Sequence, residues 1–269
     1  MRNLFVLTCL LLMPGMSTSI AGDPALSGIG SSDSAVHVTI IYDNYQDDQN
    51  LGTDWGFACL VEYQGYMLLF DAGREADLYR KNVQELEIHP EEIPGLFISH
   101  EHGDHTAGMS WIIEMNPSVK CYLGESFAEQ LTARGTLPPH SKGLEKPAHL
   151  YGPFYSTGDN FAAFREQGLV IKTDNGGVLI TGCGHPGAVP MIAVAEEELG
   201  IEIHTLIGGL HLMNKSGEEM DQLAASLKEM GITQICPTHC TGDNSIARLK
   251  ESFGEGYIAG GTGKTIIIQ

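Results

Sequence analysis

The sequence predicts an α+β protein in which helices cover two β-sheets. In both halves of the chain, strand patterns come first as hairpins and then alternate with helical patterns. The chain has 269 residues, of which 42% are apolar, and this is enough to build a sizeable core. The sequence contains no short-period repeat of the kind that indicates a solenoid.

Residues 1–21 are predicted to be an export signal. Arg2 supplies a positive charge, residues 4–13 are apolar but too few to span a membrane, and Ser19-Ile20-Ala21 fits a cleavage site between small residues. A lipoprotein anchor at Cys9 is not favoured, because the residues before it lack the expected small side chain. We therefore expect the mature chain to be exported as a soluble protein, to the periplasm or to the outside of the cell.

Residues 22–35 read GDPALSGIGSSDSA and are expected to form a flexible linker, because they are rich in Gly and Ser. The folded domain is expected to cover residues 36–269. The chain carries 34 acidic and 15 basic residues, a net charge of −19, which disfavours nucleic acid and anionic membranes as partners. We expect a small-molecule substrate, no nucleic acid and no stable membrane insertion. The sequence leaves the oligomeric state open.

The first half of the domain is expected to begin with strands and a hairpin whose turn is Gln64-Gly65. Apolar residues at helical spacing predict two helices after it. Four of the twelve prolines fall in Arg134–Pro153, which lacks periodicity and is predicted to be a long loop or lid. The predicted strands are Val36–Tyr42, Cys59–Tyr63, Tyr66–Phe70, Leu96–Ser99 and Val119–Leu123, and the predicted helices are Leu78–Leu86 and Met109–Met115.

The second half repeats this order. Asp174 to Gly177 supply the turn of a hairpin, and Ser216 with Glu219 predicts a capping box at the start of a helix. The apolar stripe of that helix is expected to face the core. The predicted strands are Leu169–Thr173, Val178–Thr181, Ile203–Ile207, Ile232–Cys236 and Thr265–Ile268, and the predicted helices are Ala188–Leu199, Glu218–Met230 and Ile246–Phe253.

A cluster of metal-type side chains follows the strand at 96–99, in the run SHEHGDHTAG. His100 and His102 point to the same side of an extended chain, and Gly103 permits a turn that directs Asp104 and His105 elsewhere. Two adjacent metal ions are the simplest use of all four side chains. A closed structural zinc site is disfavoured because the chain has no C-x-x-C pattern. A solvated surface cluster is disfavoured because apolar runs flank these residues.

Three further histidines also follow apolar strands, with glycine or proline beside them. They are His185 in TGCGHPG, His211 in IGGLHL and His239 in PTHCTG. Glycine at such positions lets the backbone pass close to a metal ion. These three are therefore expected to complete the site. The other histidines lack this context and are expected on the surface or in the core: His37, His89, His140, His149 and His204.

Five cysteines remain after removal of the signal, and an odd number does not indicate a disulfide framework. Cys59 and Cys121 lie in apolar runs and are expected to be small buried residues. Cys183 and Cys240 flank the candidate ligands. They could bind a soft metal, form a disulfide, or simply pack behind the ligand loops.

The stretch GGTGKT at 260–265 is not expected to bind a nucleotide phosphate. A phosphate loop needs a further glycine where Ile258 stands, and it needs a following helix, whereas only 266–269 remain.

At this point the chain resembles a known superfamily. The run HEHGDH matches the H-x-H-x-D-H signature of the metallo-β-lactamase fold, and Asp71 matches the aspartate behind its metal loop. The motifs around His185, His211 and His239 are similar to those of 7,8-dihydropterin-6-methyl-4-(β-D-ribofuranosyl)aminobenzene-5′-phosphate synthase-like proteins. The similarity covers about residues 36–269. It implies an αββα four-layer sandwich with one or two divalent ions at the edge where the sheets meet.

The resemblance also implies roles for individual residues. His100 and His102 would bind the first metal, and Asp104, His105 and His239 the second. Members with two metals carry a bridging aspartate on the strand where this chain has Cys183-Gly184-His185. His185 is therefore expected either to take over the bridge or to be the third ligand of the first metal.

Catalytic roles are expected for Asp104, which would orient water or relay its proton, and for His211, which would be a general acid, an extra metal ligand or a residue that orients a ligand without touching the metal. The expected cofactor is zinc, with Mn²⁺ or Fe²⁺ as alternatives, and the expected nucleophile is a metal-bound hydroxide.

The sequence favours an exported hydrolase of a small ester, above all a phosphoester or phosphodiester. A non-hydrolytic ligand-binding protein and an iron-dependent redox protein are the alternatives. Hydrolysis of β-lactams is disfavoured by the later motifs, and a cytosolic pterin synthase is disfavoured by the predicted export.

Overall fold

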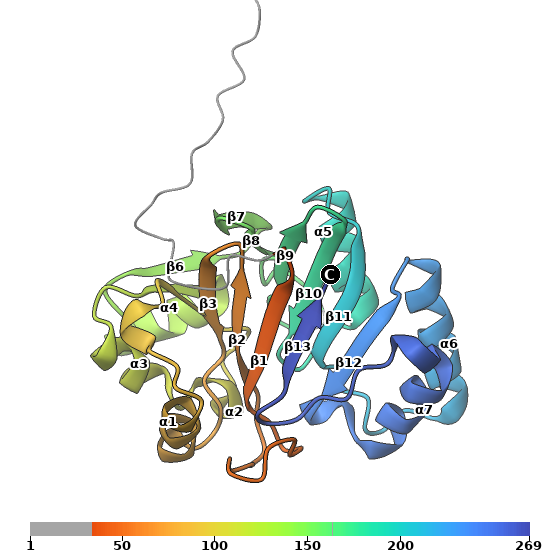
Figure 1. Ribbon diagram of the computed structural model, residues 1–269. Helices are drawn as coiled ribbons and strands as arrows, with labels where there is room; N and C mark the ends of the chain where they lie inside the picture. Colours follow the sequence, from red (N-terminus) through yellow and green to blue (C-terminus); the bar gives the residue numbers. More distant parts are fainter. Residues whose placement is uncertain (1–33, 163) are drawn as a thin grey trace, which may run out of the picture.

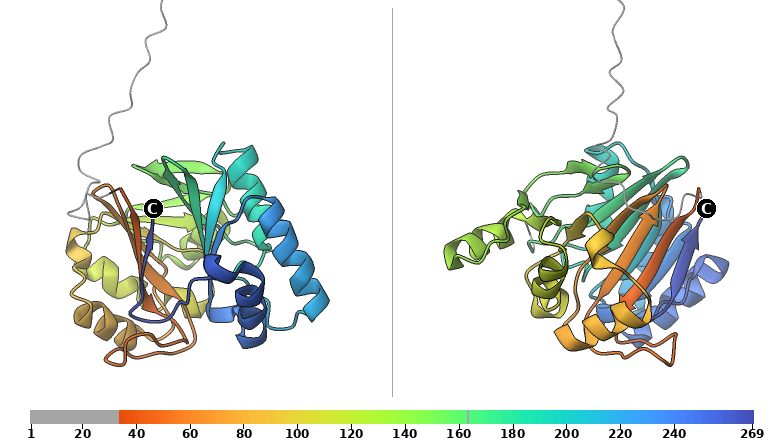
Figure 2. Two further views of the ribbon diagram at one scale, coloured as in Figure 1. Left: turned by 45° about the vertical axis from the view of Figure 1, so that its right-hand side comes forward. Right: turned by 60° about the vertical axis from the view of Figure 1, so that its left-hand side comes forward.

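The computed structural model describes residues 34–162 and 164–269, so the predicted signal peptide and nearly all of the predicted linker lie outside the described residues. Two mixed sheets pack face to face, and helices cover the outer face of each (Figures 1 and 2). This arrangement confirms the prediction of an α+β protein with two helix-covered sheets.

The first sheet has seven strands. β2 and β3 form a hairpin, and three further strands continue the sheet in parallel from β3. β1 pairs antiparallel with both β13 and β2, and β3, β4, β5 and β6 run parallel to one another. Across the sheet the strands are β13 (Thr265–Ile268), β1 (Val36–Tyr42), β2 (Ala58–Tyr63), β3 (Tyr66–Phe70), β4 (Gly95–Phe97), β5 (Lys120–Gly124) and β6 (Ser141–Leu144).

The second sheet has six strands and a similar plan. β10, β11 and β12 are parallel neighbours, whereas β9 pairs antiparallel with β10, β8 with β9, and β7 with β8. Across the sheet the strands are β12 (Gln234–Thr238), β11 (Ile203–Gly209), β10 (Gly176–Thr181), β9 (Leu169–Thr173), β8 (Phe154–Ser156) and β7 (Ala148–Tyr151).

Three apolar layers hold the sandwich together. Buried residues of both sheets meet in the middle, and each sheet also packs on the helices outside it. The helices of the first half are α1 (Ala76–Glu85), α2 (Gly103–Thr106), α3 (Met109–Met115) and α4 (Glu125–Arg134). Those of the second half are α5 (Ala188–Glu197), α6 (Gly217–Glu229) and α7 (Asp243–Phe253), with short 3₁₀ turns η2 (Pro90–Glu92), η3 (His239–Thr241) and η4 (Gly254–Gly256).

Local signals in the sequence explain why several boundaries match the predictions. Ser216 and Glu219 form the predicted capping box, with the Ser216 side chain accepting from the Glu219 amide and the Glu219 carboxylate accepting from the Ser216 amide. The turn between β9 and β10 lies at the predicted polar and glycine residues. At 265–268 the chain forms a strand and not a helix, as expected for a stretch that is no phosphate loop.

The prediction of a loop or lid at Arg134–Pro153 is wrong. This segment contains β6 and β7, each at the edge of a different sheet, so here the chain crosses from the first sheet to the second. Both strands are four residues long, and several of their side chains are exposed. Such strands are recognised through their partners more than through their own composition, because an edge strand has a neighbour on one side alone.

Within the described residues, no helix is long and apolar enough to cross a membrane. All five cysteines of the described chain are buried free thiols, so a disulfide between Cys183 and Cys240 is not formed.

Candidate metal centre

The candidate site lies where the carboxyl ends of the parallel strands of both sheets come together. The loop after β4 carries His100 and His102, the loop after β10 carries Cys183, and η3 after β12 carries His239. The ends of parallel strands are open and rigidly held, and they are common places for ligand and metal sites. The fold therefore brings together histidines that are up to 139 positions apart in the sequence.

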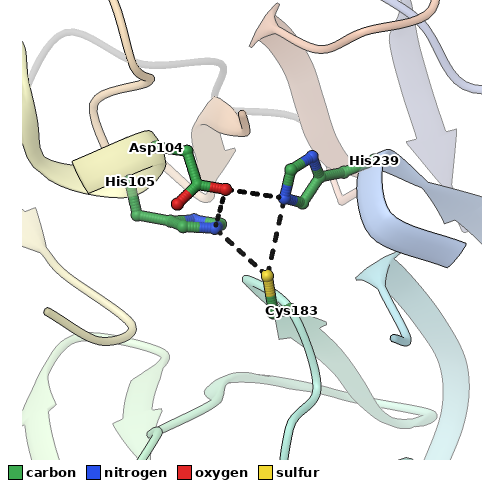
Figure 3. Close-up of side chains that lie close together, drawn as sticks. All are labelled: Asp104, His105, Cys183 and His239. Carbon is green, nitrogen blue, oxygen red and sulfur yellow. Dashed lines mark hydrogen bonds and ion pairs between the residues drawn. The ribbon is translucent and has the colours of Figure 1, made fainter. Parts of the chain in front are cut away.

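One group of donors combines Asp104, His105, Cys183 and His239 (Figure 3). The Cys183 sulfur lies 3.3 Å from Nε2 of His105 and 3.5 Å from Nε2 of His239. Oδ2 of Asp104 lies 3.6 Å and 3.4 Å from the same two nitrogens. Both imidazoles are fully buried, whereas the Asp104 side chain keeps 18% of its surface exposed. A polar group of four donors thus faces one point, with Asp104 on the side toward solvent.

A second group contains His100, Cys183 and His185, with His102 beside them. Nδ1 of His102 lies 3.0 Å from Nε2 of His100 and 3.3 Å from Nε2 of His185. Three ring nitrogens therefore converge, and one proton on His102 can satisfy only one of the two contacts. Cys183 belongs to both groups, so its sulfur lies between them.

A second set of side chains fixes the orientation of the buried imidazoles. Nδ1 of His105 donates to Asp71 at 2.7 Å, and Nδ1 of His239 donates to Oδ1 of Asn44 at 3.0 Å. Nδ1 of His100 lies 2.9 Å from the Ser99 hydroxyl, which itself donates to Asp71 at 2.8 Å.

In each of these three imidazoles Nδ1 is occupied, and Nε2 is left to face the cluster. This is the arrangement in which a histidine is held as a metal ligand.

Electrostatics keep the imidazoles of the second group, that of His100 and His185, neutral. Burial, together with the neighbouring histidines, lowers the pKa of His100 well below its ordinary value and that of His185 to about 4. Neutral imidazole is the form that binds metals.

In the other group, burial opposes ionisation of Asp104, but the hydrogen bond to His239 and the field of His105 outweigh it and lower the pKa of Asp104. A carboxylate is thus available at neutral pH.

Backbone strain concentrates at this centre. Five described residues other than glycine have a positive φ, and three of them are Asp71, His211 and His239, at 55°, 52° and 47°. Side chains other than glycine rarely adopt this conformation, which costs of order 1–3 kcal/mol. The strained backbone thus places His239 in the cluster, Asp71 behind His105, and His211 beside His185.

Sequence reasoning missed Glu166, which is fully buried. Its carboxylate accepts backbone N–H groups from Gly182, Cys183, Gly184 and His185, at 3.1, 3.0, 2.8 and 2.8 Å. Burial nevertheless raises the pKa of Glu166 to about 7. Glu166 therefore fixes the loop that carries Cys183 and His185. No sequence signal marks it, because its partners are backbone groups.

His211 lies apart from the two groups. Its imidazole is exposed, and its ring centroid lies 4.5 Å from that of His185. A hydrogen bond with Cys240 raises the pKa of His211, and the bonds from Cys183 and His211 lower the pKa of Cys240 to about 4 against the effect of burial. His211 and Cys240 thus form an ion-pair-like contact beside the cluster.

The donors fit a divalent metal. In both groups imidazole nitrogens face one another with too few N–H protons to hydrogen-bond every nitrogen. A carboxylate and a thiol lie beside them, and further hydrogen bonds hold the inward-facing imidazoles in place. All six residues predicted as ligands, His100, His102, Asp104, His105, His185 and His239, lie in or against this cluster. Cys183 is added by the structure, which places it at the centre and not behind the ligand loops.

Two comparisons of the sequence agree with the motifs. A family model described as the anti-Pycsar protein Apyc1 matches residues 52–131. The chain is also 27% identical to the 7,8-dihydropterin-6-methyl-4-(β-D-ribofuranosyl)-aminobenzene-5′-phosphate synthase of Methanocaldococcus jannaschii, over 90% of this chain and 99% of that protein. This similarity confirms the resemblance that the motifs indicate.

Solved structures show the same architecture. Tm1679, a metal-dependent hydrolase of the β-lactamase superfamily, has a TM-score of 0.72 at 21% identity, with 86% of this chain and 98% of that chain covered. A diphosphatase from the PhnP family has a TM-score of 0.57 at 11% identity, with 87% and 97% covered. At these identities the likeness concerns the fold, and the fold of the similar structures is the metallo-β-lactamase fold.

Proposed function

We propose that this chain, which has the metallo-β-lactamase fold, is a metal-dependent hydrolase of small phosphoesters or phosphodiesters. The observation that carries the proposal is the donor cluster that shares Cys183 between two groups. Two cations held side by side suit the displacement of an alkoxide from phosphorus, because one can stabilise the attacking oxygen and the other the leaving oxygen. The similar diphosphatase also favours a phosphate-bearing substrate.

The proposed ligands divide into two sets. His100, His102 and His185 would hold one ion, and Asp104, His105 and His239 the other. The thiolate of Cys183 would bridge the two ions. It would do so where other members of the fold have an aspartate, and His185 would then be a ligand of the first ion and not the bridge. When bound, a divalent metal lowers the pKa of a coordinated water from 15.7 toward about 7.

Residues of the chain would then guide the protons. Asp104 is the carboxylate of the cluster that reaches solvent, and its lowered pKa leaves it ionised, so it can accept a hydrogen bond from the attacking water. His211 is exposed beside His185, and its raised pKa favours the protonated form. We assign it the role of donating a proton to the leaving oxygen.

A cavity of about 550 Å³ opens beside His239 and would receive the organic part of the substrate. Trp55 lines it, with its ring centroid 4.8 Å from that of His239, and Met213 contributes an exposed side chain. Neither lysine nor arginine is among the residues that line it. A substrate with one phosphoryl group at the metals suits this cavity better than one with several phosphates.

The proposal includes export, because residues 1–21 have the pattern of a signal peptide. The mature enzyme would then act in the periplasm or outside the cell. This location separates it from a cytosolic synthase.

The test is a panel of substrates assayed side by side with the purified mature protein: phosphomonoester, phosphodiester, lactone, thioester and β-lactam. We expect turnover of a phosphorus ester that a chelator abolishes and that zinc or manganese restores. His102→Ala should lose metal and at least about 100-fold in turnover, because it removes a donor of the cluster. Glu101→Gln, a change at the neighbouring exposed residue, is the matched control and should keep both.

Two results would contradict the hydrolase proposal. One is near-normal turnover by His102→Ala. The other is bound iron with oxygen consumption and no ester turnover, which would support a redox protein.

A further inference from the structure

A third group of donors shares Cys183 with the two groups described above. It contains Cys183, His211 and Cys240, and the two sulfurs and the nearest imidazole nitrogen lie within 4.8 Å of one another. These residues follow β10, β11 and β12 in turn. Because the three strands are parallel neighbours, their carboxyl ends place one donor each at the same edge of the second sheet.

Glycine makes this close approach feasible. A side chain on Gly209 would begin 2.8 Å from the Cys240 sulfur and 2.3 Å from the Gly182 carbonyl oxygen. The absence of a Cβ at Gly209 therefore leaves room for the sulfur. The Thr241 hydroxyl accepts the Leu210 amide at 3.1 Å and ties the loop before His211 to η3.

Two features distinguish the third group from side chains that merely pack together in the core. His211 holds a positive φ of 52° although it is not glycine, and this strained backbone directs its imidazole toward Cys240. Cys183 and Cys240 are 4% and 1% exposed, whereas His211 is exposed. The exposed imidazole therefore lies between solvent and the two buried sulfurs, so a cation can reach the sulfurs beside it.

We propose that Cys183, His211 and Cys240 form a third binding site, which shares Cys183 with the other two groups, for a thiophilic cation of the class of Zn²⁺, Cd²⁺ or Cu⁺. Two sulfurs and one imidazole are soft donors, which distinguishes this group from the carboxylate and imidazoles of the catalytic groups. Coordination exchanges each remaining thiol proton for the cation and releases that proton to solvent.

This inference rests on the proposed function in one respect. A cation at the third group would occupy His211 and remove the proposed proton donor. Excess thiophilic metal should therefore inhibit an enzyme that needs its catalytic metals.

The test is a titration of the reduced, metal-free mature protein with Cd²⁺ under anaerobic conditions, followed by the ultraviolet absorption of cadmium thiolates. In the wild type the absorption should saturate with two thiolates engaged and three equivalents bound. Cys240→Ala should lose about half of that absorption and one equivalent. Cys236→Ala is the matched control, because Cys236 is a buried thiol of β12 outside all three groups, and it should titrate like the wild type.

His211→Ala provides a second test through a surface residue, in case Cys240→Ala does not fold. It should keep both thiolates but weaken the third equivalent by at least about tenfold, since one of three ligands is lost. Unchanged titrations of Cys240→Ala and His211→Ala would overturn the inference. Two equivalents with no third would overturn it too while leaving the hydrolase proposal intact, whereas three equivalents without ester turnover would refute the hydrolase alone.

Discussion

At the scale of single residues, Cys183 departs most from what its position predicts. A carboxylate is expected between the metals of this fold, and here a sulfur lies within 3.5 Å of both His105 and His239. A thiolate is softer than a carboxylate and binds zinc more readily than magnesium or manganese. The identity of one atom thus shifts the metal preference of the proposed centre toward zinc.

Asp43 is a second residue whose environment has a measurable consequence. It is fully buried, its Oδ1 accepts the His239 amide at 3.1 Å, and Oδ2 has no partner among the described residues. Burial raises its pKa from 3.8 to about 7. The folded protein therefore holds this proton more tightly than the unfolded chain, and ionisation above pH 4 costs stability.

We predict that Asp43→Asn removes this dependence in the metal-free protein. Between pH 4 and pH 7 the folded wild type binds more protons at Asp43 than the unfolded chain, so its stability falls as pH rises. The free energy of unfolding of Asp43→Asn relative to wild type should rise by up to about 1.4 kcal/mol for each pH unit in this window and level off above it.

Denaturant unfolding in the presence of a chelator measures this difference. His100 and His185 titrate in both proteins, so their contribution cancels in the comparison. A difference that stays constant from pH 4 to pH 7 would show that Asp43 is ionised throughout.

At the scale of elements, the sequence predicted most strands and helices, and five of them match to the residue: β1, β3, α3, β9 and β13. Turn residues, a capping box and apolar periodicity are local signals, and these elements carry them. β6, β7 and β8 were missed because they are short and lie toward the far edges of the sheets. The prediction also lacks α4, which lies between β5 and the segment that was predicted to be a loop or lid.

The sequence likewise indicated some residues of the candidate site and not others. Its histidines stand at the ends of apolar strands beside glycine, and this local pattern was sufficient to select His185 and His239. Glu166 and the central role of Cys183 depend on which strands become neighbours, and that information lies in the fold alone. Contacts to backbone N–H groups leave no trace in residue type.

Glycines at the ends of β10 and β11 should be essential to the centre. We predict that Gly209→Ala destabilises the protein by about 1–3 kcal/mol and weakens metal binding at least tenfold, because its Cβ would start 2.3 Å from the Gly182 carbonyl oxygen. Thermal unfolding and equilibrium metal titration measure both effects.

Gly103→Ala is the control for that prediction. Gly103 lies in the loop that carries the candidate ligands His102 and Asp104, yet nothing lies within 4 Å of a Cβ placed there. It starts α2, where alanine is favoured over glycine by roughly 0.5–1 kcal/mol. Equal losses in both variants would show that the packing around Gly209 has no special role.

At the scale of the whole molecule, the sandwich works as a frame that joins the carboxyl ends of two parallel strand sets. The first sheet contributes the loop with His100, His102, Asp104 and His105, and the second contributes Cys183, His185 and His239. Neither sheet alone supplies a complete set of donors. The net charge of −19 attracts cations and repels polyanions, which agrees with a metal centre that takes small substrates.

The central claim is that the Cys183 sulfur joins the donors of both sheets into one centre. The most direct measurement is the metal content per chain of the purified mature protein, determined by elemental mass spectrometry for wild type and Cys183→Ala after dialysis against equal, limiting zinc. We predict two ions for wild type and less than one for Cys183→Ala, with the variant still folded by circular dichroism. Equal metal content in the two proteins would contradict the account.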